Sequence, residues 1–473
     1  MPSSLLIKSC LVVDGTGAKP RRADVLVEGD RIVAVGKGLS ATTVLNAEGK
    51  VVAPGFIDTH SHADGGLLES PDAETQIRQG ITTAIVGQDG GHHLPLAEWL
   101  ADVENKHVAL NIASFVGHGT VRGKVLGTDY KRPSTPKEIR QMRALVATEM
   151  KAGALGLSSG VEYDPGLYAT TEELIALAEV AGVYEGIYIS HVRDEENEAL
   201  ESFDELIRVA SEGRLPAQIS HIKLGSSPVW GKTGAVFARM EAAARRGLDI
   251  TADVYPYTYW QSSIIVIIPT RDWANRTLWE TGLKEIGGAK NVLVTGYAPE
   301  PSWQGKTIEA LAAQEKKDTI TLIQEMVTKT NGGVGVVVTA MQEKDLKAFI
   351  AHPRIMFCTD GGLRGSHPRG AGSYPRVLGK YVREERVLSL EEAIRKMTSL
   401  PAWRMGLSDR GAIAPGKKAD LVLFDPKTVH DTATTKDPQA KPVGLTDVLV
   451  NGVPVLENGH HTGAHPGQVL RRR

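Results

Sequence analysis

Residues 55–66 read GFIDTHSHADGG, a short apolar run that ends in two histidines, His60 and His62. Alternate residues of a β-strand point to the same face, so both imidazoles can approach one ion if this run is a strand. Neutral imidazole is a favoured ligand of zinc. Two neighbouring histidines alone do not define a metal site, so the interpretation depends on what the rest of the chain places beside them.

Seven further apolar runs follow the first one. The eight runs are GFIDTH, TTAIVGQD, ALNIASFVGH, ALGLSSG, GIYISHV, PAQISHIKLG, DITADVYPY and RIMFCTDGG. Segments with the apolar spacing of helices, such as SLEEAIRKM, alternate with the runs. Eight repeats of strand and helix predict an α/β fold, namely a (β/α)8 TIM-like barrel.

The gap between the seventh and eighth runs is about 100 residues, too long for one helical crossover. We predict an insertion at about residues 271–340, with WANRTLWETGLKEIGG and TIEALAAQEKKDTITLIQEMV as helices. GGVGVVVTA is a ninth strand candidate, and we assign it to the insertion because no polar candidate follows it.

Both ends of the chain have strand and hairpin patterning. DVLVEG at residues 24–29 and DVLVNG at residues 447–452 are nearly the same hairpin written twice. We therefore predict a small β-sandwich domain built from residues 1–54 and 412–473, around a barrel domain at residues 55–411.

Composition excludes several classes of partner. The 54 basic and 56 acidic residues give a formal net charge of -2, so no broad field attracts nucleic acid or an anionic membrane. No apolar run reaches the ~18 residues of a membrane span, and Lys8 and Asp14 interrupt the start where a signal peptide needs an apolar stretch. The two cysteines cannot form a disulfide framework. We expect a cytoplasmic protein with a small-molecule partner, and homo-oligomer formation is left open.

Polar residues follow the strand runs, where a barrel builds its active site. They are His60, His62, Asp89, His118, Glu162, His191, His221, Tyr255, Tyr257 and Asp360. His191 and His221 follow neighbouring strands and can supply a nitrogen pair to a second divalent ion. Two close cations need an anionic bridge, for which Glu162 is the preferred candidate.

Asp360 is the remaining carboxylate among these residues. Such a group can take a proton from an activated water and pass it to a leaving amine. This set of polar residues therefore predicts hydrolysis of an amide, with Asp360 as the catalytic acid and base.

Motifs along nearly the whole chain resemble the amidohydrolase superfamily, most of all its D-aminoacylase (N-acyl-D-amino-acid deacylase) branch. They are GFIDTHSH, ISH, SHIK, DVYPY, TDG, HPRGAGSYPRVLGKYVRE and GAIAPGKKADLVLFD. The resemblance is weakest at about residues 271–340. It implies a zinc-dependent barrel flanked by a β-sandwich, and removal of the acyl group from an N-acyl-D-amino acid.

The resemblance also implies roles for individual residues. Metal ligands match His60, His62, His191 and His221, and the acid/base group matches Asp360. The substrate carboxylate is expected at Lys223, Tyr255 and Ser262 or Ser263, with Arg271 in IIPTR as a further candidate.

One position departs from this branch. Many D-aminoacylases carry a cysteine ligand in an Asn-Cys-Gly turn after strand two, where this chain reads GQDG with Asp89 in the place of the cysteine. Glu162 as the bridge favours a site for two divalent ions, and Asp89 as the replacement ligand is the competing assignment.

Two other functions are considered. A dipeptidase or a cyclic-amide hydrolase of the hydantoinase or dihydroorotase type would keep the fold and metals. The third possibility is a non-catalytic scaffold. Such a protein has no need for the polar residues that follow the strand runs, so their presence argues against a scaffold.

Overall fold

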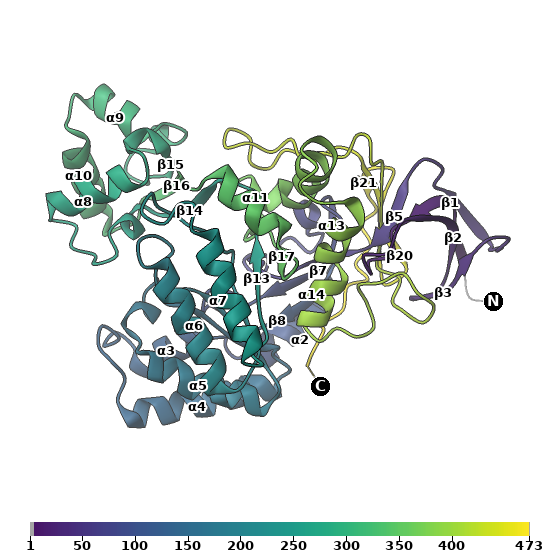
Figure 1. Cartoon of the computed structure of the whole chain (residues 1–473), viewed down its shortest axis with the longest axis horizontal. Helices are drawn as coiled ribbons and strands as arrows, with labels where there is room; N and C mark the ends of the chain where they lie inside the picture. The colour runs from purple at the N-terminus through teal and green to yellow at the C-terminus, as the bar shows by residue number, and fades with distance from the viewer. Residues whose placement is uncertain (1–3, 473) are drawn as a thin grey trace.

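The computed structural model describes residues 4–472. Residues 1–3 and 473, which belong to the two predicted parts of the β-sandwich domain, lie outside the described residues. Figure 1 shows three regions: a central barrel, a sheet beside the N-terminus, and a smaller unit on the opposite side that carries α8–α10.

The barrel consists of parallel strands in two hydrogen-bonded groups. Their orders are β17-β13-β12-β11-β10-β9 and β6-β7-β8. The bounds are β6 (Phe56–Asp58), β7 (Ile81–Val86), β8 (Asn111–Ser114), β9 (Val116–Gly117), β10 (Gly156–Gly160), β11 (Ile187–His191), β12 (Ala217–Ile219), β13 (Ile250–Val254) and β17 (Ile355–Phe357). Because β8 and β9 belong to one run interrupted at Phe115, the strands correspond to the eight predicted runs.

Contacts at two junctions close the barrel. A parallel bridge joins Ser61 to Gly361, and the amide of Asp360 donates to the carbonyl of His60 at 2.8 Å. On the other side the amide of Leu155 donates to the carbonyl of Ser114 at 2.9 Å. The barrel prediction is therefore confirmed.

Helices cover the outside of the barrel. They include α2 (Leu96–Lys106), α3 (His118–Leu126), α4 (Pro136–Lys151), α5 (Thr171–Val183), α6 (Ala199–Gly213), α7 (Thr233–Arg245), α11 (Glu343–Ala351), α12 (Arg369–Arg376) and α13 (Leu390–Met397). Helices α4 to α7 pack against one another in chain order (Figure 1). A capping box between Thr135 and Glu138 begins α4 and satisfies amides that the helix leaves free.

Strands from both chain ends form one nine-stranded sheet. Its main order is β21-β20-β19-β18-β5-β1-β2-β3, and β4 pairs with β1. The bounds are β1 (Ser4–Val12), β2 (Arg21–Glu28), β3 (Arg31–Gly36), β4 (Thr43–Asn46), β5 (Val51–Pro54), β18 (Leu421–Phe424), β19 (Leu445–Val450), β20 (Val453–Glu457) and β21 (His460–His461). The two ends meet where β5 pairs antiparallel with β18.

The segment between β13 and β17 forms an antiparallel sheet of its own, in the order β14-β16-β15. It comprises β14 (Tyr259–Ser263), β15 (Val292–Gly296) and β16 (Gly335–Thr339), with α8 (Arg276–Glu285), α9 (Ile308–Glu315) and α10 (Thr319–Thr330). The ninth strand candidate is β16, which pairs with β14 and β15. A separate hydrophobic cluster, including Trp260, Trp279 and Ile323, packs inside this unit.

Gly452 provides a test of how the chain ends are joined. It has φ +79°, and an added Cβ would overlap the carbonyl oxygen of Gly29, whereas Gly459 has φ +77° and open space around it. Gly459→Ala should cost roughly 1–2 kcal/mol for the left-handed backbone alone. Gly452→Ala should cost roughly 1–3 kcal/mol more because of the overlap. Thermal unfolding of both variants measures the difference, and equal losses would contradict this packing.

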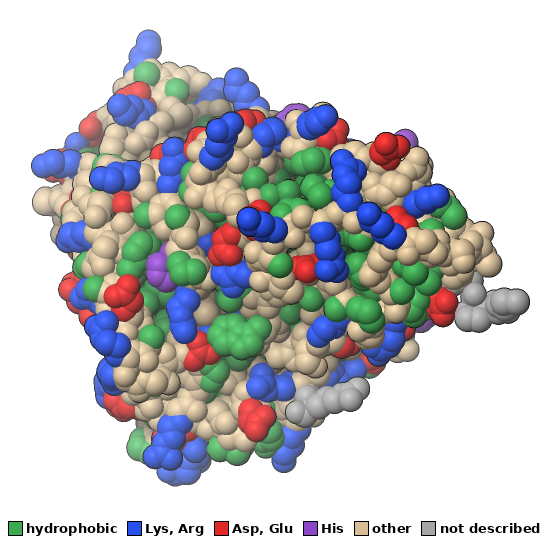
Figure 2. Space-filling model, turned by 45° about the vertical axis from the view of Figure 1, so that its right-hand side comes forward, with side chains coloured by type: hydrophobic (Ala, Val, Ile, Leu, Met, Phe, Trp, Pro, Cys, Tyr) green, Lys and Arg blue, Asp and Glu red, His purple; other side chains and the backbone are tan. Residues whose placement is uncertain are grey.

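On the face shown in Figure 2, basic and acidic side chains are interspersed. Within residues 4–472, no helix combines the length and apolar character needed to cross a bilayer.

Candidate active site and metal centre

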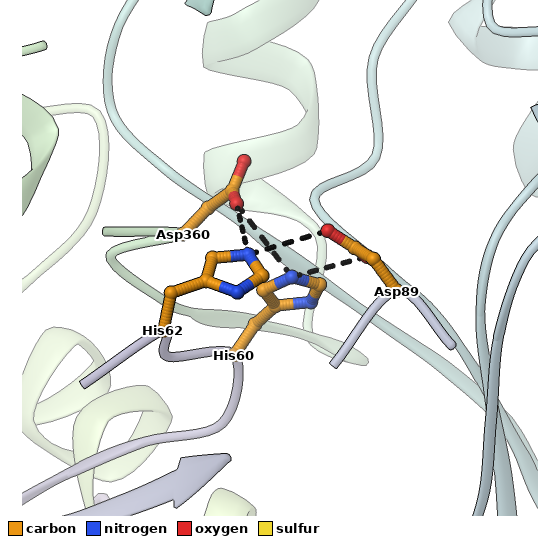
Figure 3. A group of neighbouring side chains, drawn as sticks. All are labelled: His60, His62, Asp89 and Asp360. Carbon is orange, nitrogen blue, oxygen red and sulfur yellow. Dashed lines mark ion pairs between the residues drawn. The ribbon is translucent and has the colours of Figure 1, made fainter. Parts of the chain in front are cut away.

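Four side chains from three barrel strands converge at the barrel mouth. Figure 3 shows His60, His62, Asp89 and Asp360 pointing toward one another. His62 Nε2 lies 3.3 Å from both Asp89 Oδ2 and Asp360 Oδ1. His60 Nε2 lies 3.3 Å from Asp89 Oδ1 and 3.6 Å from Asp360 Oδ1. The two histidines of the opening stretch therefore face two carboxylates at one point.

A second group of possible ligands lies beside the first and shares one residue with it. It contains Asp89, His191 and His221. His191 Nδ1 is 3.0 Å from His221 Nε2, and the latter is 3.5 Å from Asp89 Oδ1. Asp89 thus belongs to both groups.

The backbone of the turn after β7 directs Asp89 inward. Gly87, Asp89 and Gly90 all have positive φ, at 74°, 53° and 77°. Asp360 also has a positive φ of 49°. Aspartate tolerates this region better than most residues, and such strain concentrates at functional sites.

Outer carboxylates hold the far sides of the second histidine pair. His191 Nε2 is 2.7 Å from Glu162 Oε2. His221 Nδ1 is 3.1 Å from Glu195 Oε1 and 2.7 Å from Lys223 Nζ. Histidines that bind metals typically use one nitrogen for the ion and donate the other N–H to an acceptor, here the carboxylate of Glu162 or Glu195.

The residues fit a divalent metal ion. His60 Nε2 and Asp89 Oδ1 are buried and lie close together, yet neither forms a hydrogen bond within residues 4–472. A buried polar atom left unpaired costs about 1–3 kcal/mol, so two such atoms side by side call for a missing partner. Imidazole nitrogens and carboxylate oxygens are the donor set that zinc accepts.

Arg369 controls the charge of Asp360. The guanidinium Nη1 lies 2.6 Å from Asp360 Oδ2. Burial alone raises the pKa of this carboxyl, but Arg369 and then His221 outweigh burial and hold the pKa well below its usual range. Asp360 is therefore ionised at neutral pH.

A cavity of about 180 Å³ opens beside these groups. Its lining comprises His62, Asp89, Glu162, Tyr163, His191, Glu195, Glu196, His221, Lys223, Tyr255, Trp260, Gln261, Ser262, Val266, Asp360 and Arg369. The Tyr255 hydroxyl is buried without a partner among the described residues. Burial raises its pKa to about 12, against the opposing effects of Lys223 and Arg369, so the hydroxyl stays a donor.

The structure brings three of the predicted carboxylate-binding residues to the cavity, namely Lys223, Tyr255 and Ser262. Ser263, the next residue of β14, instead donates to the carbonyl of Gly332. Arg271 donates to the carbonyls of Ile265 at 2.8 Å and Glu162 at 2.6 Å, and it does not line the cavity. The guanidinium donors of Arg271 are thus used in hydrogen bonds to backbone carbonyls.

Glu162, the expected bridge, belongs to a third group of possible ligands, together with His191 and Glu195. Glu162 reaches His191 Nε2, on the side of the ring that faces away from His221. Asp89 reaches His60, His62 and His221. Whether Glu162 or Asp89 bridges two ions therefore stays a prediction.

Two residues of the site, Arg369 and Glu195, are not among the candidates that follow the strand runs. Arg369 begins α12, nine positions after Asp360, and Glu195 lies in the loop after β11. Neither position follows a strand directly. His118 stays outside the cavity, with Nε2 2.8 Å from Glu173.

Comparison with known proteins agrees with this geometry. The amidohydrolase family matches residues 51–455. D-aminoacylase of Alcaligenes xylosoxydans xylosoxydans is 35% identical over 498 residues, covering 100% of this chain and 98% of that protein. N-acyl-D-glutamate deacylase of the same organism is also 35% identical, over 99% of this chain and 96% of that protein.

A solved structure is similar over the full length. It is the N-acyl-D-glutamate deacylase from Bordetella bronchiseptica, complexed with zinc and a phosphonate inhibitor that mimics the tetrahedral intermediate. The TM-score is 0.90 at 32% sequence identity, with 100% of both chains covered. The resemblance seen in the sequence motifs is thereby confirmed, and the chain belongs to the amidohydrolase family.

Proposed function

We propose that this protein is a zinc-dependent deacylase that hydrolyses the linear amide of N-acyl-D-amino acids. The observation that carries the proposal is the sharing of Asp89 between two ligand groups, beside Asp360 and a cavity with carboxylate-binding donors. The relatives that match over the full chain are deacylases of N-acyl-D-amino acids, which favours this activity over a dipeptidase or a cyclic-amide hydrolase. The preference for substrates of the D configuration is inferred from those relatives alone.

Two ion positions are proposed. His60, His62, Asp89 and Asp360 would hold one, and Asp89, His191 and His221 the other. A divalent ion at this place polarises the amide carbonyl and lowers the pKa of water. Zinc is proposed because the donors are nitrogen and oxygen and because the similar deacylase structure contains zinc.

Asp360 transfers the proton in this proposal. Its carboxylate takes a proton from the attacking water and delivers it to the nitrogen of the leaving amino acid, while the C–N bond breaks and a carboxylic acid forms. The hydrogen bond from its amide to the His60 carbonyl fixes the backbone, and Arg369 fixes the side chain.

Arg369, Lys223, Tyr255 and Ser262 bind the substrate carboxylate in this proposal. All four line the cavity. Arg369 and Lys223 stack over the Tyr255 ring at 4.8 Å and 5.7 Å, so the three form one cluster of donors. Glu162 and Glu195 act as positioning residues that orient His191 and His221.

The domain division is also proposed. Residues 1–54 and 412–473 would form a β-sandwich, residues 55–411 the barrel, and about 271–340 an insertion. Separate hydrophobic clusters in the terminal strands and around β14–β16 support this division. The buried free thiols Cys10 and Cys358 are consistent with a cytoplasmic location, which we also propose.

A substrate panel tests the function. Protein stripped of metal with a chelator should be inactive, because no ion is left to activate the water. Stoichiometric zinc should restore the activity. Paired N-acetyl-D- and N-acetyl-L-amino acids, dipeptides and hydantoins are assayed by release of amine or ring opening. The D-series should be turned over fastest. Full activity of verified metal-free protein, or faster turnover of dipeptides or hydantoins, would contradict the proposal.

A further inference from the structure

One carboxylate in the cavity has no part in the proposed chemistry. Glu196 lies on the loop between β11 and α6 and lines the cavity. Its Oε2 atom is buried without a hydrogen-bond partner within residues 4–472. A buried polar oxygen without a hydrogen-bond partner is costly, so this oxygen at the cavity wall calls for a partner that the ligand supplies.

The charges around Glu196 do not provide that partner. Burial, followed by the carboxylates of Glu162, Asp194 and Glu195, raises the pKa of Glu196 well above its usual range. Lys223 acts in the opposite direction, and a cationic group of a ligand beside Glu196 would likewise favour its carboxylate form. However, the Lys223 ammonium lies 2.6 Å from both oxygens of Glu195 and is already paired.

A second negative charge on the substrate would find no unused cationic side chain in the cavity. Apart from histidines, the cationic lining residues are Lys223 and Arg369. Lys223 is paired with Glu195 and Arg369 with Asp360. In the proposed function, the remaining N–H donors of both bind the one carboxylate that every N-acyl amino acid carries. An acidic side chain would add a charge among carboxylates.

We propose that the amino-acid side chain of the substrate is cationic and pairs with the Glu196 carboxylate. The inference rests on the proposed function and names its substrate class: side chains of the lysine or arginine type are preferred over those of glutamate or aspartate. Trp260 and Val266 line the same cavity and can cover the methylene stem of such a side chain. The D-aminoacylase and the N-acyl-D-glutamate deacylase are each 35% identical to this chain. Sequence identity alone therefore does not decide the charge of the substrate side chain.

The test compares kcat/KM for N-acetyl-D-lysine, N-acetyl-D-norleucine, N-acetyl-D-glutamine and N-acetyl-D-glutamate. It uses the zinc-loaded wild type, Glu196→Gln and Glu198→Gln. Glu198 is exposed on the same loop and does not line the cavity, so its substitution changes the net charge equally. Calorimetric binding of free D-lysine and D-glutamate gives a readout that does not depend on turnover.

The wild type should prefer the lysine substrate over the glutamate substrate by roughly 10- to 100-fold, as expected for one charge-assisted hydrogen bond. Glu196→Gln should remove this preference and leave the norleucine and glutamine substrates within about threefold of wild type. Glu198→Gln should behave as wild type.

Two results would overturn the inference. The first is a wild type that turns over the glutamate substrate as well as the lysine substrate. The second is a Glu196→Gln variant that slows all four substrates equally, which indicates a structural role. If none of the substrates is hydrolysed, the proposed function fails instead, and the binding of D-lysine against D-glutamate still decides the charge preference.

Discussion

Asp89→Asn is expected to remove most of the bound metal and with it the deacylase activity. Asp89 belongs to both ligand groups, with oxygens 3.3 Å from the Nε2 atoms of His60 and His62 and 3.5 Å from that of His221. Loss of its charge weakens both positions at once. Asparagine is the informative substitution because it tolerates the positive φ of 53° at this position.

Glu162→Gln is the matched comparison for Asp89→Asn. Glu162 contacts the outer nitrogen of His191, so its loss should weaken metal binding by roughly 10- to 100-fold, as is typical for an outer hydrogen-bond partner. Asp89→Asn should lose more than this. Metal content after gel filtration, measured by mass spectrometry, and titration of stripped protein with zinc distinguish the two.

The comparison also decides the open question of the bridge. If Glu162→Gln loses more metal than Asp89→Asn, Glu162 is the bridging ligand and the assignment made here is wrong. Circular dichroism of both variants verifies that the barrel is intact, so that unfolding does not account for a loss of metal.

Asp360→Asn is expected to keep the fold and lose activity, with kcat lower by roughly 10²- to 10⁴-fold. The amide cannot accept a proton from water at neutral pH, whereas the carboxylate is held ionised by Arg369. Asparagine again suits the backbone, since φ is 49° at this position. KM should change less than kcat, because the substrate carboxylate binds elsewhere in the cavity.

Metal analysis accompanies this measurement because Asp360 also belongs to the first ligand group. The ion held by Asp89, His191 and His221 should be retained. Asp204→Asn, an exposed carboxylate of α6 that pairs with Arg239, serves as the control and should have wild-type kcat. Normal activity of Asp360→Asn would exclude Asp360 as the group that transfers the proton.

The barrel and much of its mouth are predictable because strand geometry is periodic. His60, His62, His191, His221 and Asp360 each follow a buried strand run. Parallel strands of a closed barrel bring such positions to one end, so their approach follows from the order of runs along the chain.

Residues in loops are not predictable in this way. Arg369 reaches the cavity through the loop that precedes α12, and Glu196 through the loop after β11. Arg271 follows a strand of the inserted unit and was expected at the substrate, but its donors hold the carbonyls of Ile265 and Glu162. No periodicity relates these positions to the barrel axis.

The sequence by itself therefore determined the α/β barrel, the histidine pair of GFIDTHSHADGG and the other ligand candidates that close the strands. Only the tertiary structure shows that Asp89 lies beside His60, His62 and His221, whereas Glu162 lies against the outer nitrogen of His191. The physical reason is local: three positive φ angles turn the backbone after β7 and aim the Asp89 side chain inward. A strand fixes the direction of its side chains by alternation, whereas a turn fixes it by dihedral angles that depend on the surrounding fold.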